Sequence, residues 1–168
     1  MSYQSFERDT PTIHELMPYA VKLFHLRWYV IGKTMNREGI LIFSMDRIQS
    51  LTVTEQKYKY PKSFNVHDYY RDSFGIIIEN GVESERVRLK VMNNQAKYFR
   101  SLPLHSSQKE IETKPDYSVF EYHLKPTYDF EQEILSHKED VEVLEPLTLR
   151  NNIKESVRKM AELYKHED

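Results

Sequence analysis

Short apolar runs separated by brief polar turns fill the N-terminal part of the chain. The runs Leu16–Phe24, Trp28–Ile31, Ile40–Met45 and Ile48–Thr54 are rich in β-branched and aromatic residues, which favour strands. Pro18 suits a sheet edge or a bend, because proline cannot donate a hydrogen bond to a neighbouring strand. Several short strands joined by short turns predict a small antiparallel barrel or sandwich.

The pattern changes in the middle of the chain. Residues 55–75 are polar and aromatic and predict a loop with a short helix around Val66–Arg71. The stretch Glu79–Glu85 has the composition of a turn, which indicates a domain boundary. We therefore expect two domains, residues 1–78 and residues 85–168.

Strands and helices alternate in the second domain. Val87, Leu89 and Val91 alternate with the basic row Arg86, Arg88 and Lys90, as in a half-buried strand. This row is either a solvated strand face or a surface for a polyanion. A helix is expected next over Asn94–Leu102, with Tyr98, Phe99 and Leu102 facing inward. A hairpin of Ile111 with Ser118–Leu124, a helix capped by Thr127 and a strand over Val141–Leu144 are expected to follow. The chain is expected to close with an amphipathic helix, one face of which carries Leu149, Ile153, Val157, Met160 and Tyr164. This β-α-β-β-α-β order is typical of a ferredoxin-like unit, so the fold class is α+β.

Composition narrows the class of protein. The chain has 168 residues, of which 39% are hydrophobic and 30% charged, and this excludes a disordered polymer. No apolar run approaches the roughly 20 residues of a membrane-spanning helix, and no secretory signal is visible, so we expect a cytoplasmic protein. The formal charge of −2 gives no overall basic excess, although the first domain is slightly basic.

Several kinds of chemistry lack their motifs. Without cysteine there is no disulfide, thiolate nucleophile or zinc–thiolate site. The sequence contains no glycine-rich phosphate loop and no nucleophile elbow. The seven histidines are scattered without metal-binding spacing. We therefore expect neither an enzyme nor a metal or cofactor site.

Two motifs resemble those of the WYL domain family. They are Arg27-Trp28-Tyr29-Val30-Ile31-Gly32, with Val30 at the third position of the Trp-Tyr-Leu run, and Phe43-Ser44-Met45-Asp46-Arg47-Ile48. The frame around them also fits, from Tyr3-Gln4-Ser5 and Met17-Pro18-Tyr19 to Val87-Arg88-Leu89 and Val141–Pro146 in the family's usual C-terminal extension. The resemblance covers nearly the whole chain.

The resemblance implies an Sm-like, SH3-type barrel followed by a ferredoxin-like extension domain. Members are mostly bacterial transcriptional regulators in which a winged helix-turn-helix precedes a ligand-sensing WYL domain, and in several the ligand is single-stranded nucleic acid. This chain opens at the first barrel strand, so we expect the DNA-binding domain to be absent. The chain is then either a C-terminal fragment of a longer regulator or a free-standing sensor.

The family's polar cluster, matched residue by residue, gives the candidate ligand-binding residues Tyr3, Ser5, His14, Tyr29 and Arg47, and proximity to the motif adds Arg27. Trp28 and Tyr29 point to opposite faces of one strand, so Trp28 is expected to be buried and Tyr29 to lie on the polar face. Arg47 either binds a phosphate, pairs with Asp46 or caps backbone carbonyls at a strand end. We expect the Arg47 guanidinium and the Tyr29 phenol to face one cavity.

The sequence departs from the family on the fourth strand. Leu41-Ile42-Phe43-Ser44 stands where many relatives have a basic run, which weakens the case for nucleic acid. Two alternatives therefore stay open. One is an effector domain for a small, uncharged metabolite bound between barrel and extension. The other is an interaction module, such as a homodimer formed through the closing helix or the aromatic stretch 58–74.

Overall fold

The computed structural model describes residues 1–79 and 81–165. It divides into two compact units, Met1–Tyr69 (unit 1) and Tyr70–Asp168 (unit 2). This division falls before the predicted boundary segment, of which Asn80 lies outside the described residues. The last three residues of the predicted extension domain, including His166, also lie outside them.

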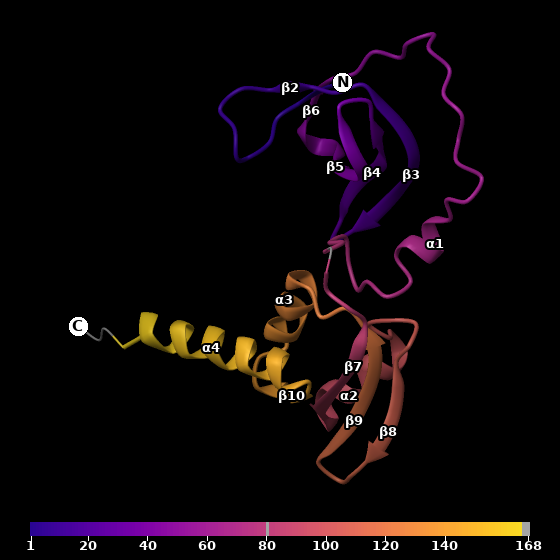
Figure 1. Ribbon diagram of the computed structural model, residues 1–168. Helices are drawn as coiled ribbons and strands as arrows, with labels where there is room; N and C mark the ends of the chain where they lie inside the picture. The colour runs from indigo at the N-terminus through magenta and orange to yellow at the C-terminus, as the bar shows by residue number, and fades with distance from the viewer. Residues whose placement is uncertain (80, 166–168) are drawn as a thin grey trace. The chain divides into compact units, whose positions relative to one another are not determined.

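Unit 1 contains two three-stranded antiparallel sheets (Figure 1). One has the order β3 (Leu16–Phe24), β4 (Arg27–Thr34), β5 (Arg37–Ser44), and the other has the order β2 (Thr12–Ile13), β1 (Ser2–Tyr3), β6 (Ile48–Ser50). Strand pairing among the described residues does not close these sheets into a barrel. A one-turn 3-10 helix, η1 (Met45–Arg47), joins the sheets, and α1 (Val66–Tyr69) ends the unit.

The two sheets share one small core. Tyr3 of β1 is buried with Val30 of β4 and Phe43 of β5, and Leu16 and Ile48 pack against them. The Tyr3 and Phe43 rings meet edge to face with centroids 5.0 Å apart, a favoured aromatic geometry. Burial of these side chains therefore holds β1 and β6 against the larger sheet.

The strand predicted over Ile48–Thr54 is shorter than expected. β6 ends at Ser50, because its partner β1 has only two residues, paired as Ser2↔Ser50 and Tyr3↔Ile48. Leu51 and Val53 are exposed. Their alternation with polar residues therefore does not mark a strand.

The prediction that Trp28 is buried is wrong. Trp28 is 52% exposed, whereas Val30 and Ile31 are buried. The pairing of β4 with β5 stops at Tyr29↔Ser44, so Trp28 has only Leu23 of β3 beside it. The indole therefore lies beyond the end of the shared core.

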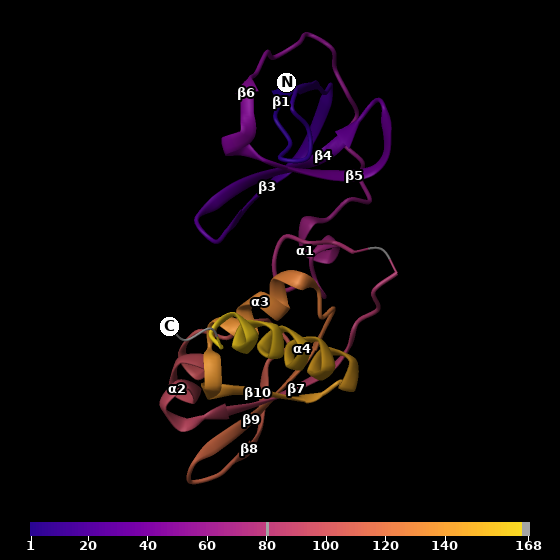
Figure 2. The ribbon, with the colours of Figure 1, turned by 90° about the vertical axis from the view of Figure 1, so that its left-hand side faces the viewer.

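Unit 2 is a four-stranded antiparallel sheet with helices on one face (Figure 2). Its elements follow the chain as β7 (Glu85–Met92), α2 (Asn93–Ser101), β8 (Lys109–Thr113), β9 (Tyr117–Leu124), α3 (Tyr128–Ser136), η2 (Lys138–Asp140), β10 (Val141–Glu145) and α4 (Leu147–Leu163). The strand order is β10-β7-β9-β8. This is the β-α-β-β-α-β arrangement that the sequence predicts, and it confirms a mixed α+β fold.

The core of unit 2 follows the predicted alternation along the strands. Val87, Leu89 and Val91 of β7 are fully buried and pack with side chains from α2, α3, β9 and β10. The burial of side chains on two helices, α2 and α4, differs from expectation. On α2, Ala96 and Phe99 are buried, while Tyr98 and Leu102 are exposed.

The closing helix α4 reaches the core only at its start. Leu149 is buried and Ile153 is partly buried. Val157, Met160 and Tyr164 on the predicted apolar face are about half exposed or more, because α4 runs away from the sheet (Figure 1). The amphipathic pattern therefore predicts the helix correctly but not the burial of its second half.

Candidate functional site

Three of the predicted ligand-binding residues line one cavity of about 240 Å³ in unit 1. Tyr3, Ser5 and His14 come from the first residues of the chain and from the turn between β2 and β3. Arg37, at the start of β5, completes the lining from the larger sheet. We call this cavity the His14 pocket.

Hydrogen bonds and ring contacts fix the His14 imidazole. Its Nε2 lies 2.8 Å from Thr12 Oγ1 in a hydrogen bond, and its ring centroid is 4.9 Å from that of Phe43 and 6.3 Å from that of Tyr3. Burial lowers the pKa of His14, and the charges of Arg37 and Arg8 lower it further. Near neutral pH the imidazole is therefore uncharged, and the two arginines supply the positive charge of a lining that also includes Glu7.

Arg47 lies against the aromatic wall of this pocket. Its guanidinium carbon is 5.5 Å from the Tyr3 ring centroid and 4.5 Å from the Phe6 centroid, within the range of cation–π contacts. The buried Nε of Arg47 has no hydrogen-bond partner in the part of the chain that the structure describes. An unsatisfied buried donor costs about 1–3 kcal/mol.

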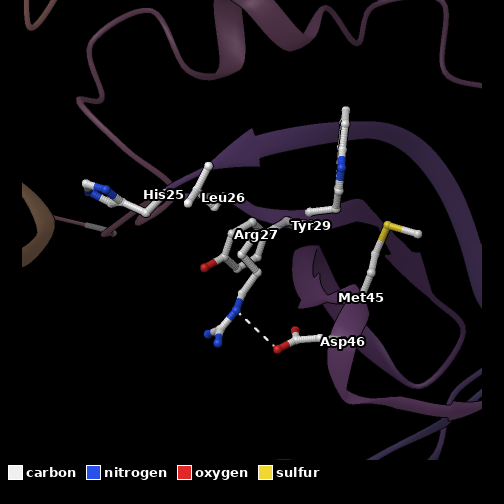
Figure 3. Close-up of a pocket in the computed structure, with 7 residues that line it drawn as sticks. His25, Leu26, Arg27, Tyr29, Met45 and Asp46 are labelled. Carbon is white, nitrogen blue, oxygen red and sulfur yellow. Dashed lines mark ion pairs between the residues drawn. The ribbon is translucent and has the colours of Figure 1, made fainter.

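Arg27 and Tyr29 line a different, open pocket of about 810 Å³ near the turn between β3 and β4 (Figure 3). Arg27 Nε is 3.2 Å from Asp46 Oδ2. The Ser44 hydroxyl donates a hydrogen bond to Asp46, and this contact, with a smaller effect of the Arg27 charge, lowers the pKa of Asp46. Asp46 therefore pairs with Arg27, and not with Arg47, whose pairing with Asp46 was one of the alternatives left open by the sequence.

The structure thus separates the six candidate residues into two groups. The expectation that Tyr29 and Arg47 face one cavity does not match it, because Tyr29 lines the second pocket and Arg47 does not. The reason is η1, which turns the chain after β5 so that the Arg47 carbonyl accepts a hydrogen bond from Gln4 N, 3.0 Å away. Arg47 therefore lies beside β1, where it contacts Tyr3, a lining residue of the His14 pocket, but it lines neither of the two pockets.

Sequence reasoning missed the other polar residues of the His14 pocket, which are Glu7, Arg8, Thr12 and Arg37. Arg37 stands in a predicted turn, and no local pattern indicates that this turn lies beside His14. Among these residues, Thr12 could have been predicted from the sequence. It lies two positions before His14, and residues two apart share a face of an extended chain.

The basic row of β7 is neutralised by carboxylates. Arg86 Nη2 is 2.8 Å from Glu145, Arg88 Nε is 2.9 Å from Glu121, and Lys90 Nζ is 3.5 Å from a Glu142 oxygen. Of the two alternatives for this row, the structure favours the solvated strand face.

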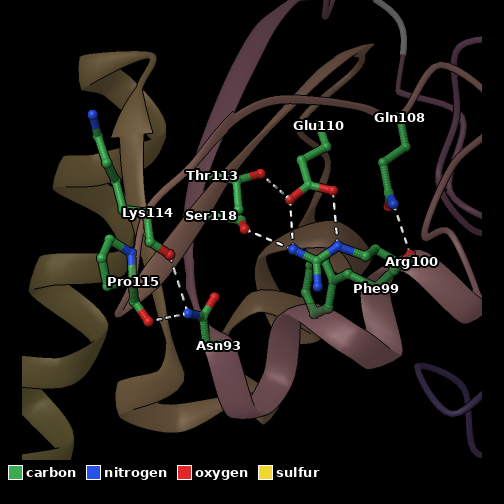
Figure 4. Close-up of polar contacts among 9 residues, drawn as sticks. All are labelled: Asn93, Phe99, Arg100, Gln108, Glu110, Thr113, Lys114, Pro115 and Ser118. Atoms are coloured by element: carbon green, nitrogen blue, oxygen red, sulfur yellow. Dashed lines mark hydrogen bonds and ion pairs between the residues drawn. The ribbon is translucent and has the colours of Figure 1, made fainter.

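A second polar cluster of unit 2 joins α2 to β8 and β9 (Figure 4). Arg100 donates two hydrogen bonds to Glu110, of 2.8 and 2.6 Å, and a third of 2.9 Å to Ser118 Oγ. These interactions lower the pKa of Glu110 to about 2, chiefly through the Arg100 hydrogen bond. Because the Arg100 guanidinium is satisfied by partners within the unit, the cluster is structural.

Within residues 1–79 and 81–165, no three acidic or histidine side chains gather as they would around a metal ion. Over the same residues, no helix combines the length and the apolar character that a membrane crossing requires.

Two solved structures resemble this chain. A CRISPR Cas-related protein has a TM-score of 0.55 at 15% sequence identity, with 97% of this chain and 46% of that chain covered. Proteasome accessory factor B/C (PafBC) of Arthrobacter aurescens has a TM-score of 0.42 at 15% identity, with 99% of this chain and 25% of that chain covered. The chain thus spans less than half the length of either protein. No curated protein matches it.

Family comparison agrees with the motifs. Residues 1–53 match the WYL domain, and residues 83–161 match the WCX domain. The first segment falls in unit 1 with both pockets, and the second falls in unit 2. The chain consists of a WYL domain followed by a WCX domain, and it belongs to the WYL-domain family of regulatory proteins.

Proposed function

We propose that unit 1 is the ligand-sensing domain of a bacterial transcriptional regulator and that it binds an anionic ligand, either single-stranded nucleic acid or a nucleotide-like effector. The observation that carries the proposal is the His14 pocket. Its lining includes Arg8 and Arg37, and Arg47 beside it keeps an unpartnered buried donor. Arginine suits this task because its planar guanidinium matches the geometry of a phosphate.

The proposal extends to the whole molecule. The common core of β1, β4 and β5 supports an Sm-like barrel that opens between the two sheets of unit 1. The module acts by binding and not as an enzyme, and it passes the state of its pocket to a helix-turn-helix domain outside this chain. Because such a regulator acts on DNA, the proposal places the protein in the bacterial cytoplasm.

Fluorescence anisotropy with labelled oligothymidylate at low salt tests the proposal. Wild-type protein is expected to bind, and Arg37→Ala and Arg47→Ala are each expected to weaken binding at least about tenfold, since hydrogen bonds to charged groups contribute about 1.5–3 kcal/mol. Arg100→Ala is the matched control, because Arg100 lies in unit 2 and is satisfied by Glu110. Absence of binding to oligonucleotides and to mononucleotides would refute the proposal.

The second pocket favours a different candidate, an effector domain for a small, uncharged metabolite. Its lining includes Leu26, Trp28 and Met45, and its cation Arg27 is paired with Asp46. A thermal-shift screen separates the candidates. Stabilisation by an uncharged compound that Trp28→Ala abolishes and Arg37→Ala leaves unchanged would favour the second pocket.

The exposed half of α4 favours the third candidate, a homodimer. Val157, Met160, Leu163 and Tyr164 leave an apolar strip on this helix, and such strips often mark interfaces. Light scattering over a range of protein concentrations tests it. A monomer at the highest concentration would contradict a dimer.

A further inference from the structure

An aromatic cluster on the surface of unit 1 joins Tyr19 to residues outside the family motifs. The Tyr19 ring of β3 is surrounded by rings from the loop that follows β6, with centroid distances of 6.4 Å to Tyr58, 5.5 Å to Tyr60 and 5.2 Å to Phe64. Phe64 in turn contacts Tyr69 of α1 at 5.6 Å. Figure 1 shows this loop running past β3 before it reaches α1.

Two of these rings are held in place and yet open to solvent. Tyr58 is 40% exposed and Tyr60 is 45% exposed. The Tyr58 hydroxyl donates a hydrogen bond to the Pro18 carbonyl, and the Tyr60 ring stands edge-on to those of Tyr19 and Phe64. Rings that are already ordered lose little conformational entropy when a ligand stacks on them.

Lysines interleave with these rings. Lys57, Lys59 and Lys62 are exposed, and none of them forms an ion pair among the described residues. The segment 57–64 contains no carboxylate, and Glu55 is the acidic residue just ahead of it. Flexible ammonium groups beside aromatic faces are the combination that holds the phosphates and the unstacked bases of a single strand.

A further cavity of unit 1, with Glu15 as the acidic residue of its lining, lies between this cluster and the His14 pocket. It has a volume of about 290 Å³, and its lining includes His14, Pro18 and Tyr58. Because His14 also lines the His14 pocket and Tyr58 also belongs to the aromatic cluster, the three sites adjoin one another. A mononucleotide fills only one of them, whereas a strand of several nucleotides spans the series.

We propose that residues 57–64, with Tyr19, form a stacking platform for single-stranded nucleic acid, which extends the His14 pocket into a binding track. Tyr58 and Tyr60 stack on successive bases, and Lys57, Lys59 and Lys62 contact the phosphates. The pocket end of the track rests on the proposed function. The platform adds residues 57–64, which the WYL motifs quoted above do not include, to Tyr19, which they do. The ligand is therefore an oligonucleotide, bound more tightly as its length grows.

The experiment measures the binding of two labelled probes to the full chain. The long probe is an oligothymidylate of about 12 nucleotides, a length within the range that one small binding domain covers. The short probe is a thymidine dinucleotide. In the variant Tyr58→Leu/Tyr60→Leu the apolar packing stays and the aromatic faces are removed. It is expected to bind the long probe at least about tenfold more weakly, because each stacked base contributes about 1–3 kcal/mol. It binds the dinucleotide like wild type. Tyr58→Phe/Tyr60→Phe keeps the rings and is expected to keep most of the affinity.

Charge is tested separately. Lys57→Gln/Lys59→Gln/Lys62→Gln is expected to reduce the dependence of log affinity on log salt by roughly 0.7 for each phosphate that these lysines neutralise in wild type. Lys154→Gln, on the exposed part of α4, is the matched control. Circular dichroism establishes that each variant is folded.

The outcomes distinguish the two proposals. Equal binding of the long probe by wild type and by the folded leucine variant would overturn the platform, even if the pocket binds the dinucleotide. Both proposals are supported if Arg37→Ala loses dinucleotide binding and the leucine variant binds the long probe more weakly than wild type. Failure of wild type to bind the dinucleotide, together with leucine-sensitive binding of the long probe, would refute the pocket and keep the platform. Failure to bind either probe would overturn both.

Discussion

Replacing Asp129 with alanine is expected to destabilise unit 2 by about 1–3 kcal/mol. Asp129, at the start of α3, is only 6% exposed. Its Oδ2 accepts hydrogen bonds from the backbone N–H groups of Ile76 and Ile77, at 2.9 and 3.1 Å. Its Oδ1 accepts from Thr127 Oγ1 at 2.5 Å and from Phe130 N at 3.0 Å. One carboxylate thus joins the segment ahead of β7 to the first turn of α3.

The magnitude follows from what each donor can do once the carboxylate is gone. Hydrogen bonds to charged groups contribute about 1.5–3 kcal/mol each, but four such values do not add. Ile76 and Ile77 are only partly buried, so water can replace their bonds at little cost. Thr127 is 1% exposed and its hydroxyl stays unsatisfied. Thr127→Val, which removes that one donor, is therefore expected to cost only about 1 kcal/mol.

Urea unfolding followed by far-UV circular dichroism measures the destabilisation, and hydrogen exchange of the Ile76 and Ile77 amides locates it. Asp129→Ala should accelerate exchange at both amides, whereas Thr127→Val should leave them protected. If Asp129→Ala unfolds within about 1 kcal/mol of wild type, or if the two amides stay protected, the carboxylate does not anchor this segment and the reasoning fails.

Four other changes give distinct outcomes. The pKa of Glu110 is lowered to about 2 from 4.5, so its contribution to stability is present above pH 4.5 and disappears as the pH falls toward 2; thermal melts of Arg100→Gln should show a smaller fall over this range than wild type. An NMR titration should place the pKa of His14 below its ordinary value of 6.5, and inorganic phosphate should raise it if the pocket binds anions. Leu26→Gly should raise the melting temperature, with a gain of about 1 kcal/mol, because Leu26 has a φ of 62° and is 97% exposed; an unchanged melt would count against strain in this turn. Arg47→Met keeps an unbranched side chain against the rings of Tyr3 and Phe6 and removes the unsatisfied donor. The variant should therefore be as stable as wild type or more stable by up to about 1 kcal/mol, while its affinity for oligothymidylate falls. A large drop in stability would make Arg47 a structural residue.

The sequence predicts those elements whose burial is decided within one strand or one helical turn. Val87, Leu89 and Val91 are buried as expected, because neighbours on both sides of β7 enforce the alternation that the sequence shows. Trp28 has the same kind of pattern but lies where β5 has already ended. The alternation of apolar and polar residues indicates which side chains share a face of a strand. It does not indicate where the neighbouring strand ends, so it cannot show whether a side chain such as Trp28 is covered.

The same limit applies to the site. Tyr3, Ser5 and His14 come together as the family resemblance implies, because β1 and β2 are adjacent in sequence and pair directly. Arg37 reaches the same pocket from the far end of the β4–β5 hairpin, and its place there depends on how the two sheets pack. Local pattern carries no information on that packing, so this cation could be found only in three dimensions.

The position of Arg47 links the fold to the proposed sensing. η1 places its guanidinium on the rings of Tyr3 and Phe6, where the stem is packed but the Nε donor stays unsatisfied. Natural proteins pair almost all such donors, and under the proposed function a ligand oxygen is the missing partner. An anion bound in the His14 pocket would lie among Arg8 and Arg37, which line it, next to the Tyr3 ring that Arg47 contacts. Because Tyr3 lines this pocket and also belongs to the core shared by β1 and the larger sheet, ligand binding would stabilise that packing, which gives unit 1 a physical means of responding to its ligand.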